Sequence, residues 1–189
     1  MKVLNYRIFL YGGSCTGKTC FAKELKKQLD IPLFSLDNIF WYGDWENVGN
    51  EALLSEVNRI IGENESWIID GNYRIVKENI RDKATHIYFC HNNIAVLTWR
   101  VLKRCLSKNR EGVPEKIKES TDKREKFWSL FSMVLRYQLV KKKEDVKYYR
   151  KLKANGVNIK KIKCNKKNIE GEISIVRGSA PTVTYERAE

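Results

Sequence analysis

The chain has 189 residues, a formal net charge of +13 and a hydrophobic share of 42%. This length fits one domain that buries its own core, and the lack of any long apolar run excludes a membrane-spanning protein. Because the five cysteines form no C-x-x-C pair and no signal peptide is recognisable, we expect a reduced protein of the cytoplasm.

The positive charge is concentrated in one part of the chain. Residues 100–170 hold 23 basic and 8 acidic side chains, a net charge of +15. Such a field attracts nucleotides, phosphorylated substrates or nucleic acid. A solvated basic surface that keeps the protein soluble is the alternative. DNA is therefore a possible partner, although no recognition motif accompanies the charge and we do not favour it.

The first apolar run predicts a buried strand over about 6–11, and apolar residues at helical spacing predict a helix over about 18–29. Between them lies a segment that fits the P-loop pattern G-x-x-x-x-G-K-[ST]: Gly12, Gly13, Ser14, Cys15, Thr16, Gly17, Lys18 and Thr19. In this pattern backbone N–H groups cradle phosphates, Lys18 reaches the outer phosphates and the Thr19 hydroxyl binds Mg²⁺. The segment predicts ATP and Mg²⁺ as cofactors.

A second strand is predicted at 33–36, followed by Asp37 and an aromatic loop over 40–45. Asp37 either acts on a substrate hydroxyl, holds Mg²⁺ or substrate, or caps the next segment. In the loop, Trp41 and Trp45 either stack on a substrate or pack a small subdomain over the sheet. A helix with one apolar face follows, over about 53–61.

The third predicted strand is 67–70, and Asp70 at its end has the Walker B arrangement, a carboxylate near the P-loop and its Mg²⁺. The alternative is an Asx turn with Asn72. We expect Thr19 and Asp70 to be the metal-binding residues.

Further elements predicted from the sequence are a strand at 86–90, a helix at 94–108, a polar stretch at 109–123, a long helix at 124–153 and a strand at 157–162. Alternation of strands and helices predicts an α/β protein with a three-layer P-loop NTPase fold and a five-stranded parallel sheet. We expect one domain over 1–170, with a substrate-binding insert at about 37–66 and a small helical lid at about 105–124. The remaining 171–189 are expected to be a partly disordered extension.

Phosphoryl transfer needs cations around the moving group, and arginine supplies them most often. The candidates are Arg74, Arg100, Arg104 and Arg110. Arg100 and Arg104 share one helix face, where a solvated basic surface is the alternative. The apolar stripe on the helix that follows is wide enough for a partner subunit, so the protein is expected to be a monomer or a homodimer.

Three segments beside the P-loop carry a resemblance: 36–41, 67–74 and 99–104. Together they resemble the adenylate kinase superfamily, and more closely its bacterial relatives called DNA topology modulation proteins. The resemblance implies a sheet order of 2-3-1-4-5 and a moving lid. It also implies Lys18 and Thr19 on ATP–Mg²⁺, Asp70 near the metal, and Arg74, Arg100 and Arg104 around the phosphates. Asp37 at the end of strand two is instead similar to kinases of the shikimate and gluconate type.

The sequence therefore predicts an ATP-dependent phosphotransferase that moves the γ-phosphoryl group to a nucleotide, a nucleoside or a small hydroxylated metabolite. The expected catalytic residues are Lys18, Asp37, Asp70, Arg100 and Arg104. The expected substrate-binding residues are Asp37, Trp41, Trp45, Arg74 and Arg110. The alternative is a nucleotide-regulated DNA-binding protein with little or no kinase turnover.

Overall fold

The computed structural model describes residues 5–42, 46–106 and 123–178, with the side chains of 123–126 left out. Its centre is a parallel sheet of β1 (Arg7–Tyr11), β2 (Leu33–Ser35), β5 (Trp67–Asp70), β6 (His86–Cys90) and β7 (Ile159–Ile162). The strands lie in the order β2-β5-β1-β6-β7, and all four pairings are parallel. Numbered by their place along the chain, these strands run 2-3-1-4-5, which confirms the expected topology.

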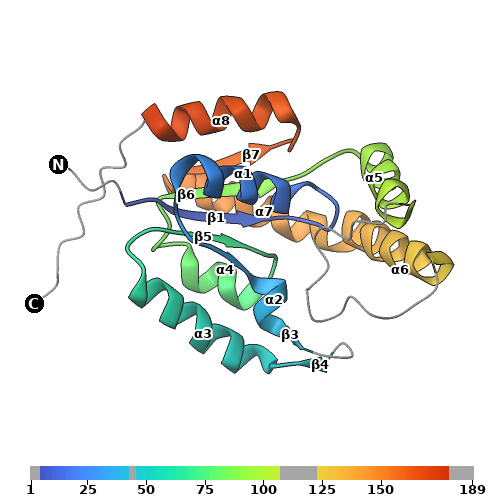
Figure 1. Ribbon diagram of the computed structural model, residues 1–189, viewed down its shortest axis with the longest axis horizontal. Helices are drawn as coiled ribbons and strands as arrows, with labels where there is room; N and C mark the ends of the chain where they lie inside the picture. The colour runs from blue at the N-terminus through green and yellow to red at the C-terminus, as the bar shows by residue number, and fades with distance from the viewer. Residues whose placement is uncertain (1–4, 43–45, 107–122, 179–189) are drawn as a thin grey trace, which may run out of the picture.

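Helices cover both faces of the sheet, so the three-layer prediction is confirmed (Figure 1). One face carries α1 (Lys18–Leu29) and α8 (Lys166–Gly178). The other carries α3 (Gly49–Glu63), α4 (Arg74–Ile80) and α7 (Lys142–Ala154). Alternate residues of β1 enter the two cores: Ile8 and Leu10 on the first face, Phe9 and Tyr11 on the second. Such burial on both faces explains why the strand reads as a continuous apolar run.

α8 runs across the domain boundary expected at residue 170. Its residues Ile169, Ile173 and Val176 are buried in the core that α1 shares. The spacing of these three residues is that of one helix face. Residues 179–189 lie outside the described part of the chain.

The expected aromatic loop is a short helix and a hairpin. α2 (Leu36–Phe40) leads directly into β3 (Trp41–Tyr42), which pairs antiparallel with β4 (Glu46–Asn47). The centroid of the Phe40 ring lies 5.0 Å from that of the Trp41 ring and 4.8 Å from that of the Tyr73 ring. These contacts fasten the hairpin to the segment that follows β5. Trp45 lies outside the described residues.

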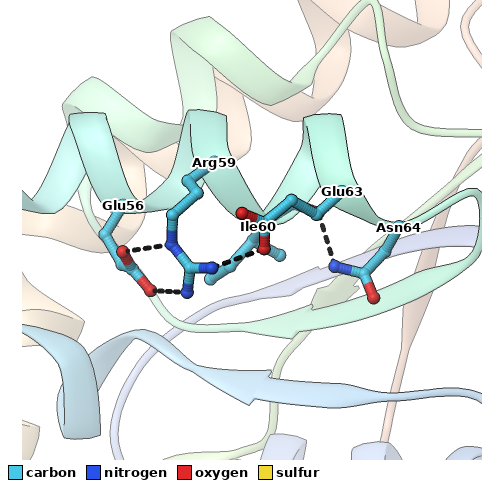
Figure 2. A network of polar contacts seen from close by, with 5 residues as sticks. All are labelled: Glu56, Arg59, Ile60, Glu63 and Asn64. Atoms are coloured by element: carbon cyan, nitrogen blue, oxygen red, sulfur yellow. Dashed lines mark hydrogen bonds and ion pairs between the residues drawn. The ribbon is translucent and has the colours of Figure 1, made fainter.

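The outer face of α3 carries a small charged network near its C-terminal end (Figure 2). Arg59 pairs with Glu56 three residues before it, at 2.6 Å, and with Glu63 four residues after it. Asn64 closes the helix, because its side-chain amide donates to the carbonyl of Ile60 at 2.8 Å. The charged side chains are in contact with solvent, so these ion pairs add little to the stability of the fold.

Beyond the sheet edge, α5 (Ile94–Leu106) packs against α6 (Lys123–Arg136). The joint core holds Leu97, Val101 and Val134, with Phe127 and Phe131 against it. The expected lid at 105–124 lies almost wholly outside the described residues.

The single helix expected over 124–153 is interrupted by a π-helical turn at Tyr137–Lys141, labelled η2, which joins α6 to α7. Apolar side chains such as Trp128 and Leu135 stay exposed on α6, so a partner subunit there remains a prediction. Within the described residues, the helices are too short or too polar to cross a membrane.

Candidate active site

The segment 12–19 forms the turn between β1 and α1 that its pattern predicts. Gly12 has φ +138° and Gly17 has φ +97°, values that L side chains rarely adopt. A Cβ on Gly12 would also overlap the carbonyl oxygen of Cys90. The two glycines thus let the loop curl tightly at the carboxyl end of the sheet, where ligands of such folds bind.

A set of hydrogen bonds holds the loop in shape. Lys18 Nζ donates to the carbonyl of Gly13 at 2.9 Å, and the buried Thr16 hydroxyl donates to the same oxygen at 2.8 Å. The side-chain amide of Asn92 donates to the carbonyl of Thr16 at 3.1 Å. Asn92 follows β6 and is buried. No sequence motif singles out this residue.

Thr19 and Asp70 meet as the sequence predicts. The Thr19 hydroxyl donates to Asp70 Oδ2 at 2.8 Å, and Asp70 is only 5% exposed. Burial raises the pKa of the Asp70 carboxyl, and Lys18 and the Thr19 hydroxyl oppose that rise. The alternative of an Asx turn between Asp70 and Asn72 is not what the structure shows, since Asp70 Oδ2 accepts from Thr19 and Oδ1 accepts from no group among the described residues.

These two residues fit a magnesium ion. Asp70 Oδ1 is buried without a hydrogen-bond partner in the described part of the chain, which leaves a lone pair for a metal or its water. Hydroxyl and carboxylate oxygens are the donors that Mg²⁺ prefers, and Mg²⁺ keeps several waters beside one or two carboxylates.

Arg100 braces the segment 12–19, which we call the phosphate loop after the pattern that it fits. Its Nη1 donates to the carbonyl of Thr16 at 2.6 Å and to that of Cys15 at 3.2 Å, and its Nη2 donates to the carbonyl of Cys164 at 2.6 Å. Both terminal nitrogens therefore face backbone oxygens rather than an open phosphate site. One turn further along α5, Arg104 has a buried Nε with no hydrogen-bond partner among the described residues. Of the pair, Arg104 is the better candidate for an anion.

Replacing Arg100 with lysine should lower the stability of the protein, because one amine cannot reach three carbonyls on two separate segments. We expect a loss of about 1–3 kcal/mol in the free energy of unfolding. Urea titrations of the wild type, of Arg100→Lys and of Lys103→Ala measure it, since Lys103 is exposed on the same helix. Equal stability of the Arg100 variant and the wild type would contradict the bracing role.

The third part of the site lies beside β2. Asp37 is exposed in the first turn of α2, and it accepts a hydrogen bond from the Tyr73 hydroxyl at 2.8 Å. Burial and the Asp37 charge raise the pKa of Tyr73, so this phenol stays protonated. Arg74 begins α4, is exposed, and forms no ion pair within the described part of the chain. Trp41 is half-buried on β3, while Arg110 lies outside the described residues.

Several basic side chains of α7 lie together along one groove. An open groove of about 370 Å³ is lined by Gln138, Lys142, Lys143, Val146, Lys147 and Arg150. No acidic residue lines it. Burial, and then the nearby Lys161, Lys163 and Lys142, lower the pKa of His91 to about 4.

The chain matches no protein-family model and no curated protein sequence. Solved structures do resemble it. Shikimate kinase from Bacteroides thetaiotaomicron superposes with a TM-score of 0.51 at 14% identity, over 92% of this chain and 97% of that one. An uncharacterized protein from Eubacterium ventriosum gives a TM-score of 0.50 at 18% identity, over 92% and 96% of the two chains.

At these identities the likeness shows the fold alone. The chain has the P-loop NTPase fold, in the form found in shikimate kinase. The narrower resemblance to DNA topology modulation proteins stays a prediction.

Proposed function

We propose that the protein is an ATP-dependent kinase that phosphorylates a small hydroxylated acceptor. The observation that carries this is the phosphate loop with Lys18 at its end and the Thr19–Asp70 pair beside it, all at the carboxyl edge of the sheet. Loop amides and Lys18 would hold the phosphates of ATP, while Thr19 and Asp70 would hold Mg²⁺. When bound, the ion offsets the negative charge of the phosphates.

In the proposed reaction the acceptor's hydroxyl oxygen attacks the γ-phosphorus of ATP. The new P–O bond forms as the bond to the bridging oxygen of ADP breaks, and the hydroxyl proton passes to a base. Asp37 is the candidate for that base, because its carboxylate is exposed beside the sheet edge and no cation pairs with it among the described residues. The Tyr73 hydroxyl fixes one of its two oxygens and leaves the other for the substrate.

The surroundings of Asp37 favour a small polar acceptor. The neighbouring hairpin supplies the Trp41 indole, and the Arg74 guanidinium at the start of α4 forms no ion pair with the residues that the structure describes. A carboxylate, an arginine and an aromatic ring suit a molecule that carries both hydroxyl groups and negative charge. The structure of shikimate kinase from Bacteroides thetaiotaomicron, which shares the fold, supports testing hydroxylated carboxylic acids first.

The test is an ADP-release assay with Mg²⁺–ATP and a panel of hydroxylated acids, sugars, nucleosides and nucleoside monophosphates. With the acceptor that responds, Asp37→Asn should lower kcat by about 10²-fold or more, as loss of a general base does, and leave ATP affinity unchanged. Asp30→Asn is a matched control, because Asp30 is exposed at the C-cap of α1, before the start of β2, whereas Asp37 follows the end of that strand.

Acceptor-dependent ADP release would establish the kinase and its substrate class. ATP binding with no ADP from any acceptor would contradict the proposal and favour the nucleotide-regulated alternative. DNA binding at the groove on α7 would then be measured as a function of salt. An Asp37→Asn variant with normal kcat would remove Asp37 as the base and leave the kinase itself standing.

A further inference from the structure

A buried polar cluster lies behind the phosphate loop, centred on Asp145 of α7. Asp145 is 3% exposed, and its carboxylate forms an ion pair with Lys77 of α4 at 2.5 Å. Its Oδ2 also accepts hydrogen bonds from the Tyr137 hydroxyl at 2.5 Å and from the Asn72 amide at 3.1 Å. Buried charges are costly unless fully paired, so such a cluster calls for a reason beyond packing.

Tyr137 joins this cluster to the phosphate loop. Its ring packs so closely on Gly13 that a Cβ at that position would overlap the ring atoms. Gly13 supplies the carbonyl to which both Lys18 and Thr16 donate. One turn earlier, Met133 of α6 accepts a hydrogen bond from the neighbouring Ser14 hydroxyl at 3.2 Å. The phosphate loop therefore rests on the end of α6 and the start of η2.

Asn72 joins the cluster to the metal-binding strand end. It stands two residues after Asp70, and Gly71 between them is held by its N–H bond to the carbonyl of Leu10 at 3.1 Å. A small residue is required there, because a Cβ on Gly71 would lie 2.5 Å from Leu36 Cβ. Because Gly71 is held in this way, the backbone positions of Asp70 and Asn72 are coupled to each other.

The π-helical turn is what lets one helix present both Tyr137 and Asp145 to this site. In a regular α-helix, residues eight apart point about 80° away from each other, whereas residues seven apart point within about 20°. A π turn takes up one extra residue, so Tyr137 and Asp145 share a face. Such turns are frequent at functional sites, and a periodic reading of the sequence does not reveal them.

We propose that Tyr137 and Asp145 are positioning residues, which fix the phosphate loop at Gly13 and the Asp70 strand end at Asn72 in the geometry that binds the phosphates of ATP. This inference rests on the proposed function, since it assigns the residues to the same nucleotide site. Neither residue touches the reacting atoms. Burial and the Asp145 charge raise the pKa of Tyr137, so its hydroxyl remains a donor to Asp145.

The test is Tyr137→Phe, which keeps the ring on Gly13 and removes only the hydroxyl. Loss of one hydrogen bond to a carboxylate is expected to weaken Mg²⁺–ATP binding about fivefold to tenfold, measured by calorimetric titration. Inorganic triphosphate with Mg²⁺ should lose affinity by the same factor, because the defect lies at the phosphates. Tyr88→Phe is the matched control: its buried hydroxyl bonds to Glu172 at 3.4 Å, within the core that α8 covers.

A merely structural role would lower the melting temperature of both tyrosine variants and spare the affinity of the folded protein. Unchanged affinity of Tyr137→Phe for ATP and triphosphate would therefore overturn the proposal, and so would an equal loss in Tyr88→Phe. In the kinase assay, Tyr137→Phe should raise the KM for ATP, while its kcat stays within about twofold of the wild-type value. The reason is that the lost interaction stabilises the ground state and the transition state equally. A wild type that binds no ATP would instead contradict the proposed function.

Discussion

Replacing Lys18 with alanine should lower ATP turnover by roughly two or more orders of magnitude. A cation aimed at the transferring phosphoryl group is worth about that much, because it acts where negative charge develops. In the structure the Lys18 ammonium is held at the Gly13 carbonyl, within the loop that would surround the phosphates. ADP release with the responding acceptor measures the effect.

Lys26→Ala is the control for Lys18→Ala. Lys26 lies in the last turn of the same helix and is exposed. It therefore carries the same charged group as Lys18 but lies at the other end of α1, away from the phosphate loop. Lys18→Ala should keep its fold, because it loses one hydrogen bond at a half-buried position. Undiminished turnover in Lys18→Ala would show that the loop does not carry phosphoryl transfer in this protein.

The sheet and the phosphate loop were predictable because their signals are local. Strands buried on both faces are short apolar runs, and β1, β5 and β6 each show one. The loop needs glycine where φ is positive, and Gly12 and Gly17 stand at those positions. The meeting of Thr19 with Asp70 then follows, because parallel neighbouring strands end at the same edge.

The arginines were harder to interpret, because their partners come from distant segments. Arg100 has the residue type and spacing of a phosphate ligand, and its guanidinium is taken up by the carbonyls of Thr16, Cys15 and Cys164. Backbone carbonyls leave no mark in the side-chain sequence. The final helix is a different case: Ile169, Ile173 and Val176 show a helical period that could have extended the domain past residue 170.

The cluster around Asp145 could not be predicted at all. A continuous helix over 124–153 would point Tyr137 and Asp145 about 80° apart, and the π turn brings them onto one face. Their partners Asn72 and Lys77 lie 73 and 68 residues away along the chain. Each of the four residues reads alone as an ordinary surface or turn residue.

Asp145→Ala is expected to lower the free energy of unfolding by about 3–5 kcal/mol, the usual result of removing one partner of a buried ion pair. The loss leaves the Lys77 ammonium, whose side chain is 11% exposed, without its counter-charge. It also removes the acceptor for Tyr137 and Asn72. Urea unfolding measures the change, and Glu144→Ala, exposed on the same helix, should stay within about 0.5 kcal/mol of the wild type.

A double replacement distinguishes the effect of the buried ion pair on stability from the effect of Asp145 on ATP binding. Because the cost in Asp145→Ala arises mainly from the unpaired lysine, Asp145→Leu with Lys77→Met should recover most of the lost stability. The same double variant should still bind ATP less tightly than the wild type, since Tyr137 and Asn72 no longer share an acceptor. Recovered stability with full ATP affinity would mean that the ion pair serves the fold alone. Recovered stability with weakened affinity separates the two roles, and it assigns Asp145 to the phosphate site.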